Sequence, residues 1–408
     1  EHKIPHVVRF SVRSALIIAR AKFWIINTRL PLWLKKPQGT TVIQTWHGTP
    51  LKTLGRDVSL LTMPGMTVEK YHNNVVKDSD KWDYCLSPNS YSTDIFKQAF
   101  RLRPEQMINS GYPRNDVLHN HTESYANDLK EKLGIAKDRK VILYAPTWRD
   151  NEYVRSDYYT AKLHLDLKEM QKRFGNQAVL LVRTHYLIAN NLNLNENDFA
   201  IDVSDYQDIN DLYIVSDLLI TDYSSVFFDY ANLKKPMIFY AYDLEEYAGE
   251  IRGFYFDYVE EAPGPILTQE EQVYQEIEKQ LETPQLANNY EQFVKKYCSW
   301  DDGNATQRAL SFILNQQSYL VRELPFEKET LSVVNDIVIF SDVIGHGNYD
   351  IVKNVLAAGQ AMNVLKKAIL VDPIQGNDTG EPCYYVESND FKGWINTKDF
   401  LTLKKENS

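Results

Sequence analysis

The sequence predicts an α/β fold built on parallel sheets, followed by a small antiparallel β-barrel domain. From residue 40 onward, short β-type runs alternate with helical patterns, which is typical of βαβ units. After about Ser318, short β-type runs are instead separated by Gly, Asn, Asp and Pro clusters, which is typical of a small barrel. The length of 408 residues, with 43% hydrophobic and 25% charged residues, fits about two to three globular domains.

The individual elements follow from hydrophobic periodicity. Strands of the α/β part are expected at Thr40–Thr45, Tyr84–Ser87, Val141–Ala145, Val179–Arg183, Leu218–Thr221 and Met237–Tyr240. Helices are expected at Ser92–Phe100, Ala126–Leu133, Asp166–Arg173 and Ser225–Leu233, with one long helical region at Glu270–Leu314. The later β-type runs are expected at Thr330–Phe340, Asn363–Val371, Pro382–Glu387 and Lys392–Ile395.

These elements divide into three expected domains. The first strand group ends near Gly111, and the polar stretch Asn115–Ser124 precedes the next helix, so we place a hinge there. We therefore expect an N-terminal α/β domain over 1–115, a second α/β domain over 116–318 and a β domain over 319–408.

Residues 1–36 form a basic segment of the first domain. They contain eight Lys or Arg residues and one acid, Glu1, in a chain whose net charge is -10. At helical spacing Arg9, Arg13 and Arg20 share one face, and a separate stripe is formed by Phe10, Ser14, Ile17, Ala21 and Trp24. This pattern favours an amphipathic helix on an anionic membrane surface, and the alternative is an ordinary helix with solvated arginines. We expect no membrane-spanning helix, because Arg20 and Lys22 interrupt the apolar stretches.

Charge and cysteine content exclude several classes of protein. The acidic balance argues against a general nucleic-acid coat. Cys85, Cys298 and Cys383 lie far apart without a Cys-x-x-Cys pair, so we expect no disulfide framework, no cysteine zinc site and a reducing compartment. Asp222 and Asp229 do not form a carboxylate cluster, and we expect neither a metal nor another cofactor. Since the chain begins at Glu1 rather than Met, we expect further residues upstream.

Polar residues follow several of the predicted strands. In open parallel sheets, ligands bind beyond the carboxyl ends of the strands, so these positions predict the site. The segments are Trp46-His47-Gly48-Thr49-Pro50-Leu51-Lys52, Pro146-Thr147-Trp148-Arg149, Thr184-His185 and Asp222-Tyr223-Ser224-Ser225.

The Ser224-Ser225 turn is expected to meet a phosphate. It follows a buried strand and precedes a helix whose first backbone N–H groups lack partners, and such a helix start attracts anions. The alternative is a simple helix cap, and the spacing does not distinguish the two.

His47 is the expected general base. It lies in a turn with Gly48 and Pro50, and an imidazole can accept a proton near neutral pH. Lys52 and Arg149 are expected to neutralise phosphate charge near the same edge. Dinucleotide, P-loop, serine esterase and zinc protease motifs are missing from the sequence.

Several segments together resemble the CDP-glycerol glycerophosphotransferase family of teichoic acid synthesis. The resemblance spans roughly Ala21–Leu314, and Arg252-Gly253-Phe254-Tyr255 and Pro263-Gly264-Pro265 match its later motifs. The stronger motifs are the one containing His47, Tyr144-Ala145-Pro146-Thr147-Trp148-Arg149-Asp150, and Ile220-Thr221-Asp222-Tyr223-Ser224-Ser225-Val226-Phe227-Phe228-Asp229-Tyr230. The family implies a GT-B-like pair of Rossmann-type domains, with the donor nucleotide in the second. It also implies a polyprenyl-linked acceptor and a peripheral location on the cytoplasmic face of the cell membrane.

The resemblance also implies roles for individual residues. His47 matches the general base, His185 matches a second functional histidine, and Asp222, Ser224 and Ser225 match the segment that meets the donor phosphates.

Other site residues and the C-terminal domain complete these expectations. Thr147 belongs to the second polar segment, and Arg114 is expected to assist Arg149 and Lys52 with phosphate charge. The C-terminal runs Asn363–Ala368, Tyr384–Glu387 and Gly393–Ile395 are similar to bacterial SH3-like modules, which implies polymer binding, docking or stabilisation.

The expected reaction is transfer of glycerol phosphate from CDP-glycerol. An acceptor hydroxyl, deprotonated by His47, attacks the β-phosphorus and CMP leaves. One alternative keeps this fold but uses CDP-ribitol or another nucleotide-activated donor. A second alternative is a non-catalytic scaffold that binds wall polymer through residues 319–408.

Overall fold

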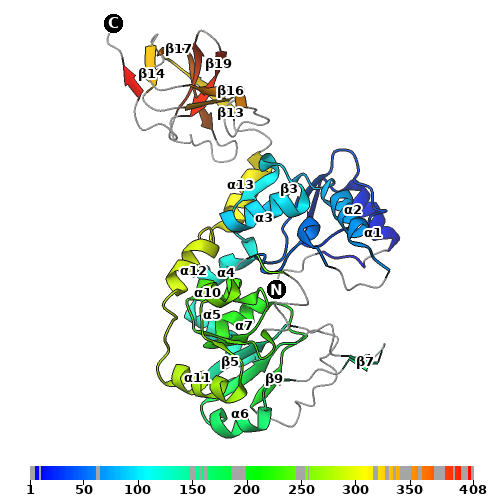
Figure 1. Cartoon of the computed structure of the whole chain (residues 1–408). Coiled ribbons are helices and arrows are strands. Elements are labelled where there is room, and N and C mark those ends of the chain that lie inside the picture. Colours follow the sequence, from blue (N-terminus) through cyan, green and yellow to red (C-terminus); the bar gives the residue numbers. More distant parts are fainter. Residues whose placement is uncertain are drawn as a thin grey trace. The chain divides into compact units, whose positions relative to one another are not determined.

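A computed structural model of the chain divides into two compact units, Glu1–Ala309 and Leu310–Ser408, which we describe separately (Figure 1). The structure describes residues 5–8, 11–60, 65–147, 153–155, 158–159, 163–184, 199–244, 253–255, 257–315, 320–326, 330–333, 337–340, 351–356, 361–371, 382–388, 391–396 and 403–405. Within these ranges, no helix is both long and apolar enough to cross a membrane.

The first lobe of the first unit contains a parallel sheet in the order β1-β2-β3-β4. Its strands are β1 (Phe23–Ile26), β2 (Thr41–Gln44), β3 (Tyr84–Ser87) and β4 (Met107–Asn109). Val42 and Ile43 in β2 are fully buried, as expected for a strand with helices on both faces. Strand β1 was not predicted. It pairs in parallel with β2 and extends the sheet by one strand.

Three capped helices accompany this sheet. They are α1 (Val12–Arg20), α2 (Val68–Ser79) and α3 (Ser90–Phe100), and the side chains of Ser11, Thr67 and Asn89 accept hydrogen bonds at their N-termini. The predicted apolar stripe through Trp24 is wrong at its end, because α1 ends at Arg20. Trp24 lies in β1, where its indole N–H donates to the Ile18 carbonyl at 3.0 Å. Arg9 and Phe10 lie outside the described residues.

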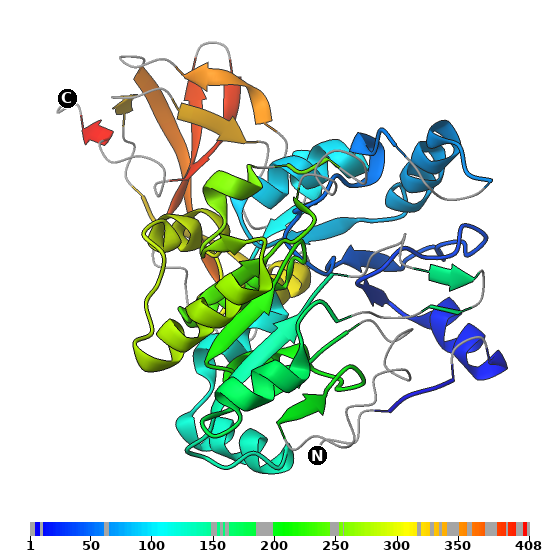
Figure 2. The ribbon, with the colours of Figure 1, turned by 60° about the horizontal axis from the view of Figure 1, so that its bottom comes forward.

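The second lobe contains a parallel sheet in the order β12-β11-β10-β5-β8-β9, whose strands are coloured cyan to green in Figure 2. The bounds are β5 (Lys140–Ala145), β8 (Ala178–Val182), β9 (Ala200–Asp202), β10 (Leu218–Thr221), β11 (Met237–Tyr240) and β12 (Ile266–Leu267). Alternate residues of β5 face two separate cores. Val141 and Leu143 pack into one, and Ile142 and Tyr144 pack into the other.

Helices cover both faces of this second sheet. The core containing Val141 also contains residues of α5 (Glu123–Lys132), α7 (Ile209–Val215), α8 (Val226–Tyr230) and α12 (Tyr290–Tyr297). The core containing Ile142 contains residues of α6 (Leu167–Phe174) and α11 (Glu270–Glu282). The two lobes therefore have the predicted parallel α/β architecture. The single long helical region predicted at Glu270–Leu314 is instead three helices, α11, α12 and α13 (Ala305–Asn315).

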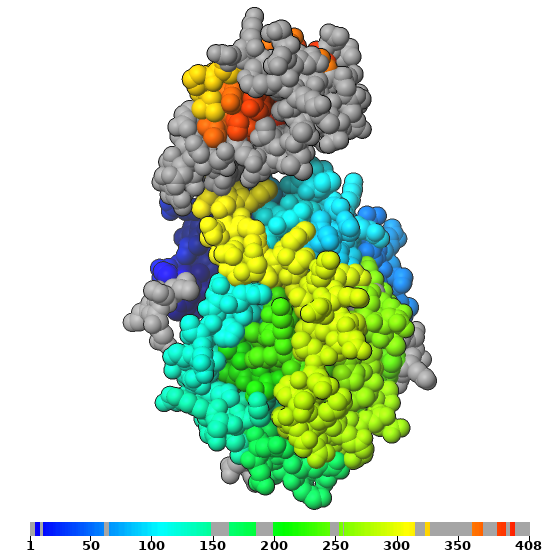
Figure 3. Space-filling model, turned by 90° about the vertical axis from the view of Figure 1, so that its left-hand side faces the viewer, coloured from blue at the N-terminus to red at the C-terminus, as the bar shows by residue number. Residues whose placement is uncertain are grey.

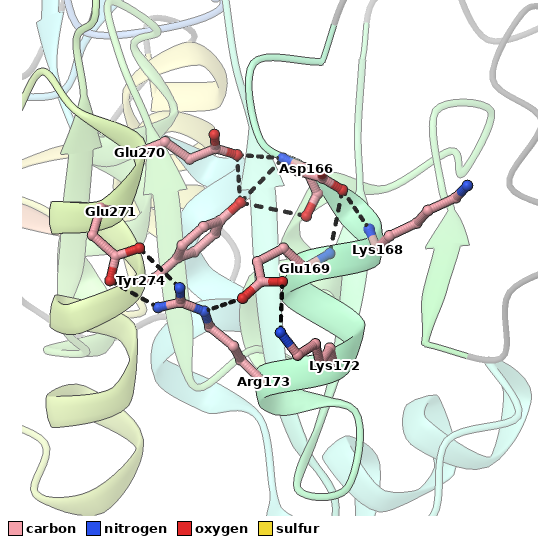
Figure 4. A network of polar contacts seen from close by, with 8 residues as sticks. All are labelled: Asp166, Lys168, Glu169, Lys172, Arg173, Glu270, Glu271 and Tyr274. Carbon is pink, nitrogen blue, oxygen red and sulfur yellow. Dashed lines mark hydrogen bonds and ion pairs between the residues drawn. The ribbon is translucent and has the colours of Figure 1, made fainter.

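An exposed polar network joins α6 to α11 (Figure 4). The Arg173 guanidinium donates to both carboxylate oxygens of Glu271, at 2.9 and 2.8 Å, and through Nε to Glu169 at 2.7 Å. Tyr274 of α11 lies beside the Arg173 guanidinium, with its ring centroid 4.7 Å away. Because exposed ion pairs add little stability, this network mainly fixes how the two helices lie along the sheet.

A buried polar network lies where the chain passes between the lobes. Arg114 pairs with Asp229 at 2.7 Å, and the Asn115 side-chain amide donates to Asp229 and to Asp301. The Tyr112 backbone N–H donates to Asp301 at 2.8 Å. Burial, with nearby Asp229 adding to its effect, raises the pKa of Asp301 to about 6. The predicted hinge region is therefore held by specific hydrogen bonds.

Helix α4 (Asp116–Asn120), which follows the passage of the chain between the lobes, contacts the start of α13. The Asp116 carboxylate of α4 accepts the backbone N–H groups of Ala305 and Thr306, both at 2.8 Å, and so caps α13. Figure 3 shows the cyan α4–α5 segment beside the yellow helices near the end of this unit, although Asp116 and Ala305 are 189 residues apart along the chain.

The second unit contains a mainly antiparallel sheet. Its described strands follow the order β16-β15-β19-β18-β17-β14-β20, and β13 also pairs with β17. The bounds are β13 (Leu320–Leu324), β14 (Thr330–Val333), β15 (Ile337–Phe340), β16 (Ile351–Leu356), β17 (Ala361–Val371), β18 (Cys383–Ser388), β19 (Phe391–Asn396) and β20 (Leu403–Lys405). The described pairs confirm the antiparallel prediction, and the closer SH3-like likeness stays a prediction.

Candidate active site

A cavity of about 440 Å³ lies at the carboxyl ends of the strands of both lobes. The first lobe contributes residues 46–52 and Leu54, directly after β2. The second lobe contributes residues that follow β5, β8 and β10, whose ends are level because Thr221 pairs with Ala145 and Val182 pairs with Tyr144. The position agrees with the rule that ligands bind beyond the carboxyl ends of parallel strands.

Trp46 introduces a backbone turn immediately before His47. Its φ angle is 53°, in the left-handed region, which costs about 1–2 kcal/mol for a side chain of this size. The indole stacks on the His47 imidazole, with ring centroids 4.4 Å apart and planes inclined by 26°, and it also packs on Phe100. This packing holds the strained turn and fixes the plane of the imidazole.

The two ring nitrogens of His47 have different surroundings. Nδ1 lies 2.8 Å from the Asn27 carbonyl oxygen, and a carbonyl only accepts, so Nδ1 carries the proton in the neutral ring. Nε2 is then the atom with a lone pair for a substrate proton. Part of the residue is exposed, but burial of the ring between the surrounding groups lowers the pKa of the imidazole below its usual 6.5. The hydrogen bond to Asn27 opposes this shift, and the positive charge of Arg114 adds to it.

Ser224 and Ser225 line the cavity from the second lobe. Ser225 is the N-cap residue of α8, yet its side chain makes no capping hydrogen bond within the described structure. The alternative reading of this turn as a side-chain helix cap is therefore not supported. A Cβ atom added to Gly48 would lie 2.9 Å from the Ser225 hydroxyl, so the turns of the two lobes touch beside His47.

Asp222 is buried next to a residue of the cavity lining. The side chain is 2% exposed and does not belong to the described lining. Its carboxylate accepts the backbone N–H of Thr147 at 2.7 Å, and Thr147 does line the cavity. The structure therefore gives Asp222 a role in holding the turn after β5, and contact with a reacting group stays a prediction.

Lys52 reaches the cavity from a short cross-lobe β-bridge. Lys52 pairs with Phe254 in antiparallel fashion, the Thr53 N–H donates to the Gly253 carbonyl, and the Tyr255 N–H donates to the Leu51 carbonyl. The predicted later motif around Gly253 thus fixes the segment that carries Lys52.

Arg114 has a different environment from the predicted one. Its guanidinium donates to both oxygens of Asp229, at 2.9 and 2.7 Å, and lies on the Tyr112 ring. Arg114 is not part of the described lining, so it acts on His47 through its charge rather than through contact.

Thr184 lines the cavity, as its place in a predicted polar segment suggested, and Arg183, which was predicted only as the last residue of a strand, lines it as well. Arg183 donates to the carbonyls of Val203 and Tyr206, at 3.1 and 2.7 Å, and the nearby Asp208 carboxylate favours its charged form. The same position after a strand end predicts both residues. His185 and Arg149 lie outside the described residues, so their predicted roles are untested.

The described lining combines one imidazole, two cationic side chains and several hydroxyl groups. Such a set can accept a proton and stabilise negative charge on a phosphate. Within the described residues, no group of three or more His, Cys, Asp or Glu side chains could hold a metal ion.

Comparisons with known proteins agree with this chemistry. Residues 1–315 match the family described as CDP-Glycerol:Poly(glycerophosphate) glycerophosphotransferase. The chain is 46% identical over 321 residues to the teichoic acid poly(glycerol phosphate) polymerase of Bacillus subtilis (strain 168), covering 78% of this chain and 43% of that protein. It is 46% identical over 315 residues to the teichoic acid glycerol-phosphate transferase of Staphylococcus aureus (strain NCTC 8325 / PS 47), covering 76% and 80%.

A solved structure and a more distant relative complete the comparison. The wall teichoic acid polymerase TagF shares 44% identity and a TM-score of 0.71, over 76% of each chain. The teichoic acid ribitol-phosphate polymerase TarK of Staphylococcus aureus is 33% identical over 312 residues, covering 74% of this chain and 58% of that protein. The chain thus spans less than half of the Bacillus subtilis polymerase, but about four fifths of the Staphylococcus aureus transferase. With this family match over most of its length, the chain belongs to the CDP-glycerol:poly(glycerophosphate) glycerophosphotransferase family.

Proposed function

We propose that the chain transfers glycerol phosphate from CDP-glycerol to a hydroxyl group of a polyprenyl-linked teichoic acid and releases CMP. The observation that carries this proposal is the single cavity lined by His47 from one lobe and by Ser224 and Ser225 from the other. Residues 1–115 then contact the acceptor and residues 116–318 bind the donor.

The proposed reaction proceeds by one displacement. The acceptor oxygen attacks the β-phosphorus of CDP-glycerol, its proton passes to Nε2 of His47, and the bond from the β-phosphorus to the CMP oxygen breaks. The Asn27 carbonyl keeps Nδ1 protonated, so both nitrogens carry protons after the transfer. Ser225, Lys52 and Arg183 then stabilise the negative charge that grows on the phosphates, and each such group typically contributes a few kcal/mol.

Two further residues complete the proposed site. His185 follows Thr184 of the lining and Arg149 follows Thr147 by two residues, and these sequence positions support a proposed role of both residues with the donor phosphates. Asp222 holds the Thr147 backbone for this purpose.

Glycerol is favoured over ribitol as the donor polyol. The relatives named for glycerol phosphate are 46% identical to the chain, whereas the ribitol-phosphate relative is 33% identical. CMP release is measured in parallel with CDP-glycerol, CDP-ribitol and UDP-sugars, using a lipid-linked glycerol phosphate acceptor. The proposal requires the highest kcat/KM with CDP-glycerol. Faster turnover of CDP-ribitol contradicts the donor assignment, and CDP binding without turnover of any donor supports a polymer-binding scaffold instead.

We also propose that the first lobe lies on the cytoplasmic face of the membrane as a peripheral protein. Val12 and Leu16 of α1 are 80% and 61% exposed, and Trp33 is 69% exposed, beside the basic Arg13 and Arg20. Co-flotation with vesicles of phosphatidylcholine and phosphatidylglycerol tests this. Replacing Val12 and Leu16 by serine is expected to abolish flotation, and unchanged flotation contradicts the assignment.

For the second unit we propose an SH3-like module that binds the wall polymer. Tyr385 and Trp394 lie on the neighbouring strands β18 and β19 with ring centroids 5.3 Å apart, which offers an aromatic surface. Trp394→Ala is expected to weaken binding of long polymer without changing CMP release with a one-unit acceptor. Unchanged polymer affinity favours a docking or stabilising role.

A further inference from the structure

A second cavity, of about 640 Å³, lies on the first lobe between η1 (Gly55–Asp57), α2 and the end of α3. We call it the α2 groove. Its lining contains Arg56 from η1, His72 and Lys77 from α2, and Arg101 directly after α3. Figure 1 shows α2 and α3 side by side in this lobe. None of these residues belongs to the lining of the first cavity.

The α2 groove is positively charged in a chain with a net charge of -10. Arg56, Lys77 and Arg101 are exposed, and none of them forms an ion pair with a described carboxylate. Among the residues described for the groove lining, Glu69 carries the negative charge. Asp57 lies next to Arg56 but does not belong to the described lining. Its carboxylate accepts hydrogen bonds from Gln98 and Tyr255. The groove therefore presents more positive than negative charge.

The backbone that carries these cations is held firmly. Gly55 has a φ of 51°, and an added Cβ would lie 2.3 Å from the Ala99 carbonyl oxygen, so η1 packs directly on α3. Arg101 has a left-handed φ of 56° and ends α3. The Nε2 atom of His72 lies 2.8 Å from the Val58 carbonyl oxygen, and this contact ties α2 to the segment after η1. Fixed positions reduce the entropy lost on binding.

The groove begins close to the first cavity. Leu54 lines the first cavity and Arg56 lines the second, and two residues span about 7 Å at most. The Tyr255 hydroxyl accepts the Leu54 N–H and donates to the Asp57 carboxylate, so one side chain fixes both ends of this short connection. The linings of the two cavities are therefore at most about 7 Å apart along the backbone at this point.

We propose that the α2 groove binds phosphodiester groups of the acceptor, a polyol phosphate chain, behind the hydroxyl that reacts. Guanidinium and ammonium groups are the side chains that bind phosphate best. The residues Glu69 to Lys77 on the groove side of α2 rise by about 12 Å, which is long enough for more than one charged group. This inference rests on the proposed function, because that function supplies the acceptor chain.

The inference predicts that affinity depends on acceptor length and on salt. A one-unit acceptor reaches only the first cavity, whereas a longer acceptor also meets the cations of the groove. Each exposed cation–phosphate pair contributes a factor of about two to three, so loss of three cations weakens binding about tenfold. The difference decreases as salt screens the charges.

Binding is tested first without turnover. The probe is fluorescently labelled poly(glycerol phosphate), and the protein is the full chain carrying His47→Ala. Adding Arg56→Ala, Lys77→Ala and Arg101→Ala is expected to raise the Kd about tenfold. The matched control replaces Lys70, Lys132 and Lys137 by alanine, which removes the same charge from exposed positions outside the groove lining. Equal Kd values for the groove and control variants overturn the inference.

Two further measurements, of KM for acceptors of different length and of binding to lipid vesicles, distinguish the remaining explanations. In the otherwise unchanged enzyme, the groove substitutions are expected to raise KM about tenfold more for a multi-unit acceptor than for a one-unit acceptor. If the probe binds through the groove but no donor is turned over, the proposed function fails and the groove remains. If the groove substitutions reduce binding to phosphatidylglycerol vesicles but not to the probe, the groove recognises lipid headgroups and the inference is wrong.

Discussion

Replacing Gly48 by alanine is expected to weaken binding of the donor much more than it lowers the stability of the fold. Gly48 does not have a left-handed backbone angle, so alanine fits the chain there. The new Cβ would lie 2.9 Å from the Ser225 hydroxyl oxygen and 3.5 Å from its Cβ, so only the hydroxyl must move. A rotated serine costs about 0.5–1.5 kcal/mol in stability. Loss of its hydrogen bond to a charged phosphate costs about 1.5–3 kcal/mol, or roughly 10- to 150-fold in donor affinity.

The assay measures the Kd of CDP-glycerol and the thermal midpoint for Gly48→Ala, Ser225→Ala and the double variant. The double variant is expected to bind the donor as weakly as Ser225→Ala alone, because alanine at 225 has no hydroxyl to displace. Gly253→Ala is the matched control, since its added Cβ would meet only the Thr53 methyl at 3.4 Å. Wild-type affinity in Gly48→Ala, or additive losses in the double variant, would show that the Ser225 hydroxyl does not bind the donor.

Other perturbations test the electrostatics of the first unit. The acid limb of kcat/KM is expected below pH 6.5, because the pKa of His47 is lowered by burial and by Arg114, and Arg114→Gln is expected to move that limb to higher pH. The pKa of Asp301 is raised from 3.8 to about 6, so the folded state binds more protons than the unfolded state between these values. Stability of the wild type relative to Asp301→Asn is therefore expected to fall by about 2–3 kcal/mol as pH rises from 4 to 7, measured by urea unfolding, and a pH-independent difference contradicts this. Trp46→Leu removes the ring stacked on His47 and is expected to lower kcat about two- to tenfold with little change in KM, and restored activity in Trp46→Phe separates stacking from packing.

The strands of the α/β part were predictable because their residues are buried on both faces. Tyr84–Ser87 and Met237–Tyr240 match the structure at both ends, since uninterrupted apolar residues between polar turns define them. Strand β1 was missed because Phe23–Ile26 follows the apolar residues of α1 almost directly. Helix α2 was missed because its few apolar residues give a weak periodic pattern, and its buried face is completed only by packing.

The site was predictable to the extent that strand ends define it. His47, Lys52, Thr147, Ser224 and Ser225 line one cavity because each follows a parallel strand. The partner of Arg114 was not predictable, since Asp229 lies over a hundred residues away in sequence and meets it only after the lobes pack. The α2 groove was hidden for the same reason, because Arg56, Lys77 and Arg101 come from three separate elements.

In the proposed reaction His47 accepts the proton from the acceptor while the second lobe holds the donor. The direct test is single-turnover CMP release by His47→Ala with saturating CDP-glycerol and acceptor, alongside the Kd of CDP-glycerol and His121→Ala as a control outside the cavity. We expect unchanged donor affinity and a rate at least about 100-fold below wild type. A folded His47→Ala protein that releases CMP at the wild-type rate would contradict it.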